Sequence, residues 1–497
     1  MNQLLARRKT CESVTDYIAQ AREGVLDAPM RQHYHFMPEV GWMNDPNGLI
    51  WFRGRYHLFF QYNPFDAFWG MMHWGHAVSD DLMHWEYLPP ALIPDQPCDD
   101  HPKGGCFSGS AIEHDGKLYL VYTGTTNEGD GFKQTQCVAW SEDGVRFEKY
   151  AGNPVLTAPA GYDPANFRDP RVFAHDGVFY MVVGAKKSER AQALLYRSED
   201  LLQWEFVNVL AESRGELGYM WECPDFFPLG DEGLYVLMFS PMGLGERKTV
   251  YLVGEMDFKT GRFSHHISGE TDWGFDCYAP QSFLDGKGRR LLIGWANAWD
   301  WMPWWKDWGP TYKEGWCGAM TLPREVVMLP DHTLAFRPVQ EVESLRDLPL
   351  VDGCDLLLKG GEARAVGCGA AAELDFTLDL AHTRASAVLL RLRVGNGRAV
   401  EVAFDLANAE LRADRNNADG WSRGTCRAPL PMKGRETMEV RVFLDMDSIE
   451  IFADGGRVCQ SLNVFAPAEQ DGIEIEARGG EASVRDLRLW SLRRSIH

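Results

Sequence analysis

The segment HLFFQY, which begins at His57, is the first of five short apolar segments that recur through the first two thirds of the chain. The others are YLVYTG from Tyr119, FYMVVG from Phe179, YVLMFS from Tyr235 and RLLIGW from Arg290. Their starts are separated by 62, 60, 56 and 55 residues, and a glycine-containing turn signal precedes each of them. Five units of short strands, with almost no helical periodicity between them, predict a five-bladed β-propeller. The alternative is a large β-sandwich whose hairpins resemble one another by chance.

A second repeated element follows three of these segments. It reads SDDLMHWEYL from Ser79, SEDGVRFEKY from Ser141 and SEDLLQWEFV from Ser198. A serine followed by acidic residues favours a turn, and the aromatic residues after it favour a strand. The element therefore predicts the turn into the outer strand of a blade.

The residues just upstream of the five apolar segments are polar at roughly equivalent positions. In a propeller the innermost strand of each blade lines the central channel, so equivalent positions in different blades converge on the axis. These positions hold Asp45, Ser108, Asp169, Glu222 and Gln281. The repeat therefore predicts that three carboxylates meet in one small polar pocket.

Changes of pattern along the chain indicate four parts. We expect a helical extension over residues 1–30, a propeller that carries the catalytic residues over 31–337, and a short linker over 338–349. From residue 350 to 497 alternating strands separated by Gly and Asn turns predict an antiparallel β-sandwich without a catalytic cluster. The predicted fold class is all-β.

Composition excludes several classes of function. The 497 residues carry 50 basic and 71 acidic side chains, a formal net charge of −21, which argues against a nucleic-acid partner or an anionic membrane surface. No signal-peptide pattern and no apolar stretch of ~18 residues is present, so we expect no membrane association. The 11 scattered cysteines favour reduced thiols in a cytoplasmic protein. No metal or cofactor motif is present, and no pattern indicates the oligomeric state.

Three acids in a concave, aromatic-rich pocket suggest hydrolysis of a glycosidic bond. One carboxylic acid protonates the leaving oxygen, and a second carboxylate attacks the anomeric carbon or activates water. Each motif also has a purely structural interpretation: Asp45-Pro46-Asn47-Gly48 is a strong turn sequence, and Arg168-Asp169 could be a local ion pair. The recurrence at equivalent blade positions favours the catalytic interpretation.

These motifs resemble those of glycoside hydrolase family 32, the β-fructofuranosidases, which include invertases, sucrose-6-phosphate hydrolases, inulinases and levanases. WMNDPNG from Trp42, FRDP from Phe167 and WECPD from Trp221 are similar to the three acidic blocks of that family. Weaker similarities run from about residue 31 to about residue 467, and SIEIFADGG from Ser448 resembles the family's sandwich domain.

The resemblance implies a role for each matching residue. Asp45 would be the nucleophile that forms a covalent fructosyl-enzyme, Glu222 the acid and then the base, and Asp169 the residue that stabilises the transition state. The resemblance also implies net retention of configuration and a reaction that needs no cofactor or metal. The residues that would bind the fructosyl group are Asn44, Gln61, Trp69, Phe107, Ser108, Arg168, Tyr278 and Trp295.

The substrate within this class is left open by the sequence. Sucrose and short fructans are the leading candidates, and the alternatives are a fructosyltransferase, a sucrose-6-phosphate hydrolase and a carbohydrate-binding propeller without activity. Seven tryptophans lie between Trp295 and Trp316, either as packing between blade five and the sandwich or as an aromatic platform for longer glycans. His73 and His76 lack further ligands at metal spacing, so we expect both to be structural or pocket-polar residues.

Overall fold

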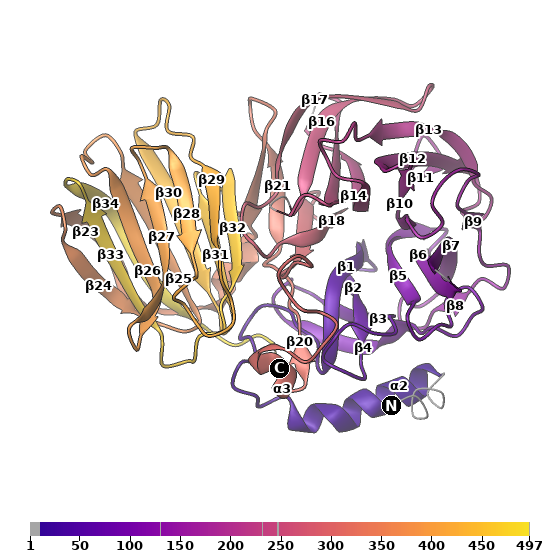
Figure 1. Ribbon diagram of the computed structural model, residues 1–497, viewed down its shortest axis with the longest axis horizontal. Coiled ribbons are helices and arrows are strands. Elements are labelled where there is room, and N and C mark those ends of the chain that lie inside the picture. Colours follow the sequence, from indigo (N-terminus) through magenta and orange to yellow (C-terminus); the bar gives the residue numbers. More distant parts are fainter. Residues whose placement is uncertain (1–9, 130, 231, 246–247, 497) are drawn as a thin grey trace.

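The protein is described by a computed structural model over residues 10–129, 131–230, 232–245 and 248–496. Over these residues five small sheets are followed by two large ones, which confirms the all-β prediction of a five-bladed propeller and a β-sandwich (Figure 1). Residues 1–9 of the predicted helical extension lie outside the described part of the chain. The rest of that extension contains helix α2 (Cys11–Ala21) and the short 3₁₀-helix η1 (Arg22–Gly24).

The first three blades follow one another along the chain. Blade 1 contains β1 (Gly41–Phe52), β2 (Arg55–Asn63), β3 (His73–Ser79), β4 (Trp85–Leu92) and, parallel to β1, β20 (Trp316–Cys317). Blade 2 contains β5 (Gly105–His114), β6 (Lys117–Glu128), β7 (Gly131–Ser141), β8 (Glu148–Lys149) and β9 (Leu156–Thr157). Blade 3 contains β10 (Phe167–His175), β11 (Val178–Lys187), β12 (Arg190–Ser198) and β13 (Glu205–Glu212).

Two further blades complete the propeller. Blade 4 contains β14 (Met220–Pro228), β15 (Leu234–Met242), β16 (Val250–Asp257) and β17 (Arg262–Glu270). Blade 5 contains β18 (Tyr278–Leu284), β19 (Arg290–Trp295), β21 (Arg324–Met328) and β22 (Leu334–Pro338), with helix α3 (Gly309–Lys313) in the connection before β20. The innermost strands β1, β5, β10, β14 and β18 each contact the next, and β18 contacts β1, so the ring closes.

The sandwich follows the 3₁₀-helix η2 (Gln340–Leu345). One of its sheets has the order β23 (Arg346–Leu358), β34 (Ala482–Leu492), β25 (Ala372–Asp379), β30 (Thr437–Leu444), β31 (Ser448–Ala453) and β32 (Val458–Asn463). The other has the order β24 (Ala363–Cys368), β33 (Gly472–Arg478), β26 (Ala387–Gly395), β27 (Arg398–Asp405), β28 (Glu410–Asp414) and β29 (Thr425–Pro429). Figure 1 shows this domain in orange and yellow beside the propeller.

The five repeated apolar segments form the second strand of each blade. Each segment contains at least one fully buried apolar residue, and these include Leu58, Leu120, Val182, Leu237 and Leu292. Because both faces of these strands are covered, they read as continuous apolar runs rather than as alternating ones.

The Ser-acid-Asp element is a turn with the same hydrogen bonds in three blades. Ser79 Oγ donates to Asp81 Oδ1 over 3.2 Å, and Ser198 Oγ donates to Asp200 Oδ1 over 3.0 Å. Each aspartate also accepts hydrogen bonds from the backbone N–H groups two and three residues after it in the sequence. The turn therefore begins the outer strand, as the repeat predicts.

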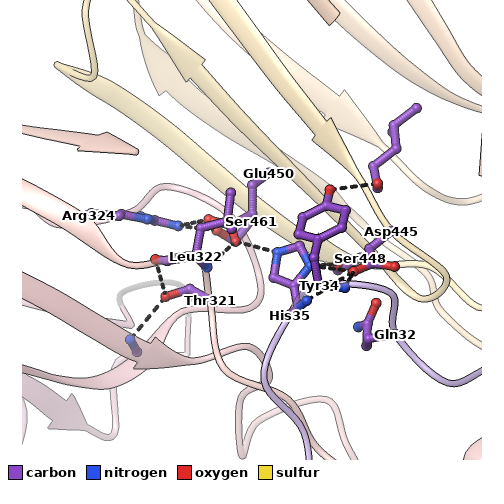
Figure 2. A network of polar contacts seen from close by, with 12 residues as sticks. Gln32, Tyr34, His35, Thr321, Leu322, Arg324, Asp445, Ser448, Glu450 and Ser461 are labelled. Atoms are coloured by element: carbon purple, nitrogen blue, oxygen red, sulfur yellow. Dashed lines mark hydrogen bonds and ion pairs between the residues drawn. The ribbon is translucent and has the colours of Figure 1, made fainter. Parts of the chain in front are cut away.

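The two domains are joined by a buried polar network around His35 (Figure 2). His35 Nδ1 lies 2.9 Å from Asp445 Oδ2, and His35 Nε2 lies 2.9 Å from Glu450 Oε1, both in the sandwich. Glu450 is also paired with Arg324 of blade 5, at 2.5 Å. Burial alone would lower the pKa of His35, but the bonds and charges of Asp445 and Glu450 outweigh it and raise the pKa to about 9. The imidazolium therefore supplies one of the charges that hold the domains together.

Replacing His35 by leucine is expected to lower the free energy of unfolding by about 3 kcal/mol near neutral pH, because it leaves buried carboxylates with one positive charge fewer. The folded pKa of about 9 lies above the unfolded value of 6.5. The contribution of His35 is therefore complete below pH 6.5 and is lost as the pH rises through about 9. Urea unfolding at about pH 6 and about pH 10 measures this difference.

His84→Leu is the matched control for this variant. His84 lies 2.7 Å from Asp81, but both side chains are largely exposed, so its loss should cost less than about 1 kcal/mol. If the difference in unfolding free energy between wild type and His35→Leu were equally large at both pH values, the charged state of His35 would be contradicted.

Candidate active site

The same irregularity occurs in all five innermost strands, at the predicted motifs. The strand register shifts between Met43 and Pro46 in β1, and equivalent shifts occur in β5, β10, β14 and β18. In four of the five strands the shift contains or borders a proline, which has no N–H to donate to the ladder. A bulge at this point re-aims the side chains that precede the proline, so these motifs place polar groups on the axis.

The bulges refine the equivalence that the repeat indicates. Asp45 and Asp169 each precede the proline of their bulge, and Cys223 takes that place in β14. Asp169 and Cys223 both have a left-handed backbone, with φ of 65° and 47°. Glu222 therefore lies one residue before Cys223, the position equivalent to the two aspartates. Its carboxylate is thereby displaced from theirs along the strand.

A pocket of about 410 Å³ opens at this ring of bulges. Nine of the predicted site residues line it, and these are Asn44, Asp45, Gln61, Trp69, Phe107, Ser108, Arg168, Asp169 and Glu222. The residues come from blades 1 to 4, so the propeller brings together side chains that are far apart in the sequence.

Asp45 is buried at the pocket, with one oxygen bonded and one without a partner. Ser108 Oγ donates to Asp45 Oδ2 over 2.8 Å, and Cys223 Sγ lies 3.6 Å from the same oxygen. Asp45 Oδ1 has no hydrogen-bond partner among the described residues. Burial and the negative charge of Glu222 raise the pKa of Asp45 to about 6, so this carboxylate is mostly ionised at neutral pH.

Asp169 is held in place by the backbone of blade 4. The N–H of Cys223 donates to Asp169 Oδ2 over 2.9 Å, and the guanidinium of Arg168 lies 3.8 Å from that oxygen. Burial and the nearby Glu222 outweigh the opposing effect of Arg168 and raise the pKa of Asp169 to about 7. Asp169 is therefore partly protonated near neutral pH, close to the two other carboxylates.

Glu222 is the most accessible of the three carboxylates, with a side chain 15% exposed. Arg168 donates to Glu222 Oε1 from Nε over 3.1 Å and from Nη2 over 2.9 Å, and Tyr278 donates to Glu222 Oε2. Arg168 is itself oriented by Gln134 and Asn166. A partly exposed carboxylate between a cation and a phenol is well placed to exchange a proton with a bound substrate or with water.

Two predicted residues lie behind the pocket instead of on its wall. Tyr278 is buried and reaches the site through its bond to Glu222. Trp295 is fully buried and packs against Trp42 and Trp299, with ring centroids 5.8 and 4.5 Å away.

Sequence reasoning missed seven residues of the pocket wall, which are Phe132, Gln134, Ala165, Asn166, Met242, Trp299 and Trp304. Most of them lie at strand ends or in connections, where no repeat pattern singles them out. The two tryptophans belong to the tryptophan-rich segment, whose predicted packing against the sandwich is present, whereas its role as a platform for longer glycans stays a prediction. Trp299 and Trp304 line the pocket, whereas Trp308 packs against Trp421 and Phe465 of the sandwich.

His73 and His76 do not face the pocket. His76 stacks on Phe59, with ring centroids 4.1 Å apart, and lies 3.1 Å from a ring nitrogen of His57. The described part of the chain holds no cluster of three or more residues suited to a metal ion. It also contains no helix long and apolar enough to cross a membrane.

Comparison with known proteins gives matches over nearly the whole chain. The glycosyl hydrolases family 32 N-terminal domain matches residues 35–338, and the C-terminal domain of that family matches residues 355–491. A raffinose invertase of Escherichia coli is 40% identical over 92% of this chain and 94% of its own length. A sucrose-6-phosphate hydrolase of Escherichia coli is 37% identical over 93% of this chain and 94% of its own.

A solved structure shows the same architecture. A family 32 β-fructofuranosidase from Bombyx mori, in complex with sucrose, superposes with a TM-score of 0.81 and 34% identity and covers 98% of each chain. These matches confirm the resemblance found in the acidic motifs. The chain belongs to glycoside hydrolase family 32 and is a glycoside hydrolase of the β-fructofuranosidase type.

Proposed function

We propose that the protein hydrolyses terminal β-D-fructofuranosidic bonds of sucrose and short fructans with net retention. The observation that carries this proposal is the meeting of Asp45, Asp169 and Glu222 in one pocket, each with a different set of partners. Release of fructose from sucrose by the purified protein tests it directly.

In the first step a carboxylate oxygen of Asp45 attacks the anomeric carbon of the fructosyl group. Glu222 gives a proton to the leaving oxygen, so glucose departs from sucrose and a fructosyl ester forms on Asp45. In the second step Glu222 takes a proton from water, whose oxygen attacks the anomeric carbon and breaks the ester. Fructose leaves, and both carboxyl groups return to their starting states.

The remaining pocket residues have supporting roles in this proposal. Asp169 accepts hydrogen bonds from fructose hydroxyls and stabilises the positive charge of the transition state. Arg168 orients Glu222, and Tyr278 donates to it from behind the wall. The other residues that we place around the fructosyl group are Asn44, Gln61, Trp69, Phe107 and Ser108, with Trp295 packed behind them.

The charge of the pocket favours substrates without a phosphate group. Arg168 is the only basic side chain among the described lining residues, and it is already bound to Glu222, Gln134 and Asn166. The rest of the wall adds the apolar side chains Phe132, Met242, Trp299 and Trp304. A phosphate dianion would therefore meet carboxylates and aromatic rings.

We expect kcat/KM on sucrose to exceed that on sucrose-6-phosphate by about 10- to 100-fold, because a like charge in this pocket is expected to cost about 1.4 to 2.8 kcal/mol. The difference in kcat/KM between the two sugars should become smaller at high salt, because salt screens the charge repulsion and does not change the shape of the pocket. Initial rates on both sugars at low and high ionic strength measure it.

Equal or faster hydrolysis of sucrose-6-phosphate would reject this preference. That substrate is the second candidate, because several relatives carry the name sucrose-6-phosphate hydrolase. A fructosyltransferase is the remaining alternative, and fructosyl oligomers formed at high sucrose concentration would reveal it.

We also propose a cytoplasmic location, which the free state of the cysteines supports.

A further inference from the structure

The segment of residues 296–308 connects the active site with the sandwich domain. Trp299 and Trp304 of this segment line the pocket, and the backbone of Trp304 accepts a hydrogen bond from the N–H of Trp69 over 2.9 Å. Trp299 packs on Trp304, with ring centroids 5.6 Å apart. The segment has no regular secondary structure, so the positions of these two rings depend on what anchors it.

The first anchor is Trp301, which lies between the two pocket tryptophans in the sequence. Its Nε1 donates to Asp276 Oδ1 over 2.7 Å. The guanidinium carbon of Arg415, a sandwich residue, lies 4.4 Å from the ring centroid of Trp301. Arg415 also donates to Asp276 Oδ2 over 2.8 Å, so one sandwich side chain holds both the ring and its hydrogen-bond acceptor.

A second anchor lies at the start of the segment. Asn297 Nδ2 donates to Asn463 Oδ1 over 2.5 Å, and the backbone N–H of Asn463 donates to Asp276 Oδ2. The backbone oxygen of Asn463 accepts from Arg415 over 2.9 Å. Asn297, Asp276, Asn463 and Arg415 are all buried, so the anchor is a buried polar network at the domain boundary.

We infer that Arg415 and Asn463 are positioning residues of the sandwich domain that set the leaving-group preference of the enzyme. They act through the segment of residues 296–308, whose rings Trp299 and Trp304 line the pocket and which this inference assigns to the leaving sugar. This inference rests on the proposed function. It assigns to the second domain a part in specificity beyond support of the propeller.

The network predicts a selective effect of mutation. Asp45 and Asp169 are held by blades 1 to 4, Glu222 is held by Arg168 of blade 3 and Tyr278 of blade 5, and none of the three bonds to Arg415 or Asn463. Loosening the segment should therefore weaken binding of the leaving group and leave the reacting atoms in place. Contacts with a leaving sugar in such a wall are worth about 10-fold in kcat/KM or more.

The test compares three substrates that share the fructosyl group: methyl β-D-fructofuranoside, sucrose and 1-kestose. In Arg415→Gln we expect KM for sucrose and 1-kestose to rise about 10-fold, with kcat and the kcat/KM on the methyl fructoside within about twofold of wild type. Trp301→Phe keeps a smaller aromatic ring beside Arg415 and removes the indole N–H that binds Asp276, so it should shift the same KM values in the same direction by less.

Arg393→Gln is the matched control. Arg393 is an equally buried sandwich arginine that donates to the backbone oxygens of Ala370 and Ala466, and it has no bond to residues 296–308. It should lower the urea midpoint as Arg415→Gln does, without changing the ratio of kcat/KM between substrates.

Each failure has its own signature. If wild type released fructose from none of the three substrates, the proposed function would fall, and the inference with it. If wild type cleaved all three but Arg415→Gln and Trp301→Phe lost activity equally on each, the role in leaving-group preference would be rejected. The same holds if Arg393→Gln produced the same selective shift.

Discussion

Replacing Asp45 by asparagine is expected to lower kcat on sucrose by at least about 10⁴-fold while the fold is kept. A neutral amide cannot attack the anomeric carbon, whereas its size and its contact with Ser108 stay nearly the same. Rates on sucrose, together with urea unfolding of both proteins, measure the loss of turnover separately from any loss of stability.

The matched control is Asp225→Asn, in the same block as Glu222. Asp225 is fully buried, lies 2.9 Å from Arg171 and accepts from the N–H of Ser282, but it does not line the pocket. Its loss should lower stability and leave most of the turnover. If Asp225→Asn were inactive and Asp45→Asn active, the nucleophile would have to be assigned again.

The same residue governs the acid side of the pH profile. Attack requires the ionised carboxylate, and burial together with Glu222 raises the pKa of Asp45 to about 6. The rate at low substrate should therefore fall as the pH falls through about 6.

A covalent intermediate on Asp45 also requires that the first-formed fructose is the β anomer, which NMR detects before mutarotation. First-formed α-fructose would mean inversion and would exclude Asp45 as a covalent nucleophile.

The blades could be predicted because each repeats one local pattern. A buried second strand must be apolar throughout, and the turn that follows Ser79, Ser141 or Ser198 needs an aspartate two residues later. Both requirements are local, so they are visible in the sequence. The convergence of Asp45, Asp169 and Glu222 then follows from the closure of the ring, without any knowledge of the contacts between blades.

The parts that could not be predicted depend on contacts between distant segments. His35 meets Asp445 across 410 positions of the chain, and Asn297 meets Asn463 across 166. Such contacts leave no periodic signal in the sequence. The equivalence of Cys223 with Asp45, by contrast, is marked in the sequence by the proline that follows each of them, although the bulge itself is set by pairing with the next strand.

Replacing Glu222 by alanine is expected to slow hydrolysis of sucrose by about 10²- to 10⁴-fold, and to slow an activated aryl β-fructoside much less in its first step. Sucrose needs a proton on its leaving oxygen, whereas an activated phenolate departs without one. Rates on both substrates measure this difference.

Rescue by azide separates an acid/base role from a structural one. Glu222→Ala removes the partner of Arg168, which leaves a guanidinium facing a space that a small anion can occupy. Azide should then attack the fructosyl ester in place of water and give a β-fructosyl azide from the activated substrate. Glu222→Gln is the control, because its amide fills that space and keeps an acceptor for Tyr278, so azide should rescue it far less. If both variants lost activity equally on both substrates, with no azide product, Glu222 would not be the acid/base. Its pairing with Arg168 would then be structural, and the proton for the leaving sugar would have to come from another carboxyl group of the pocket, of which Asp169, with its raised pKa of about 7, is the one able to hold a proton near neutral pH.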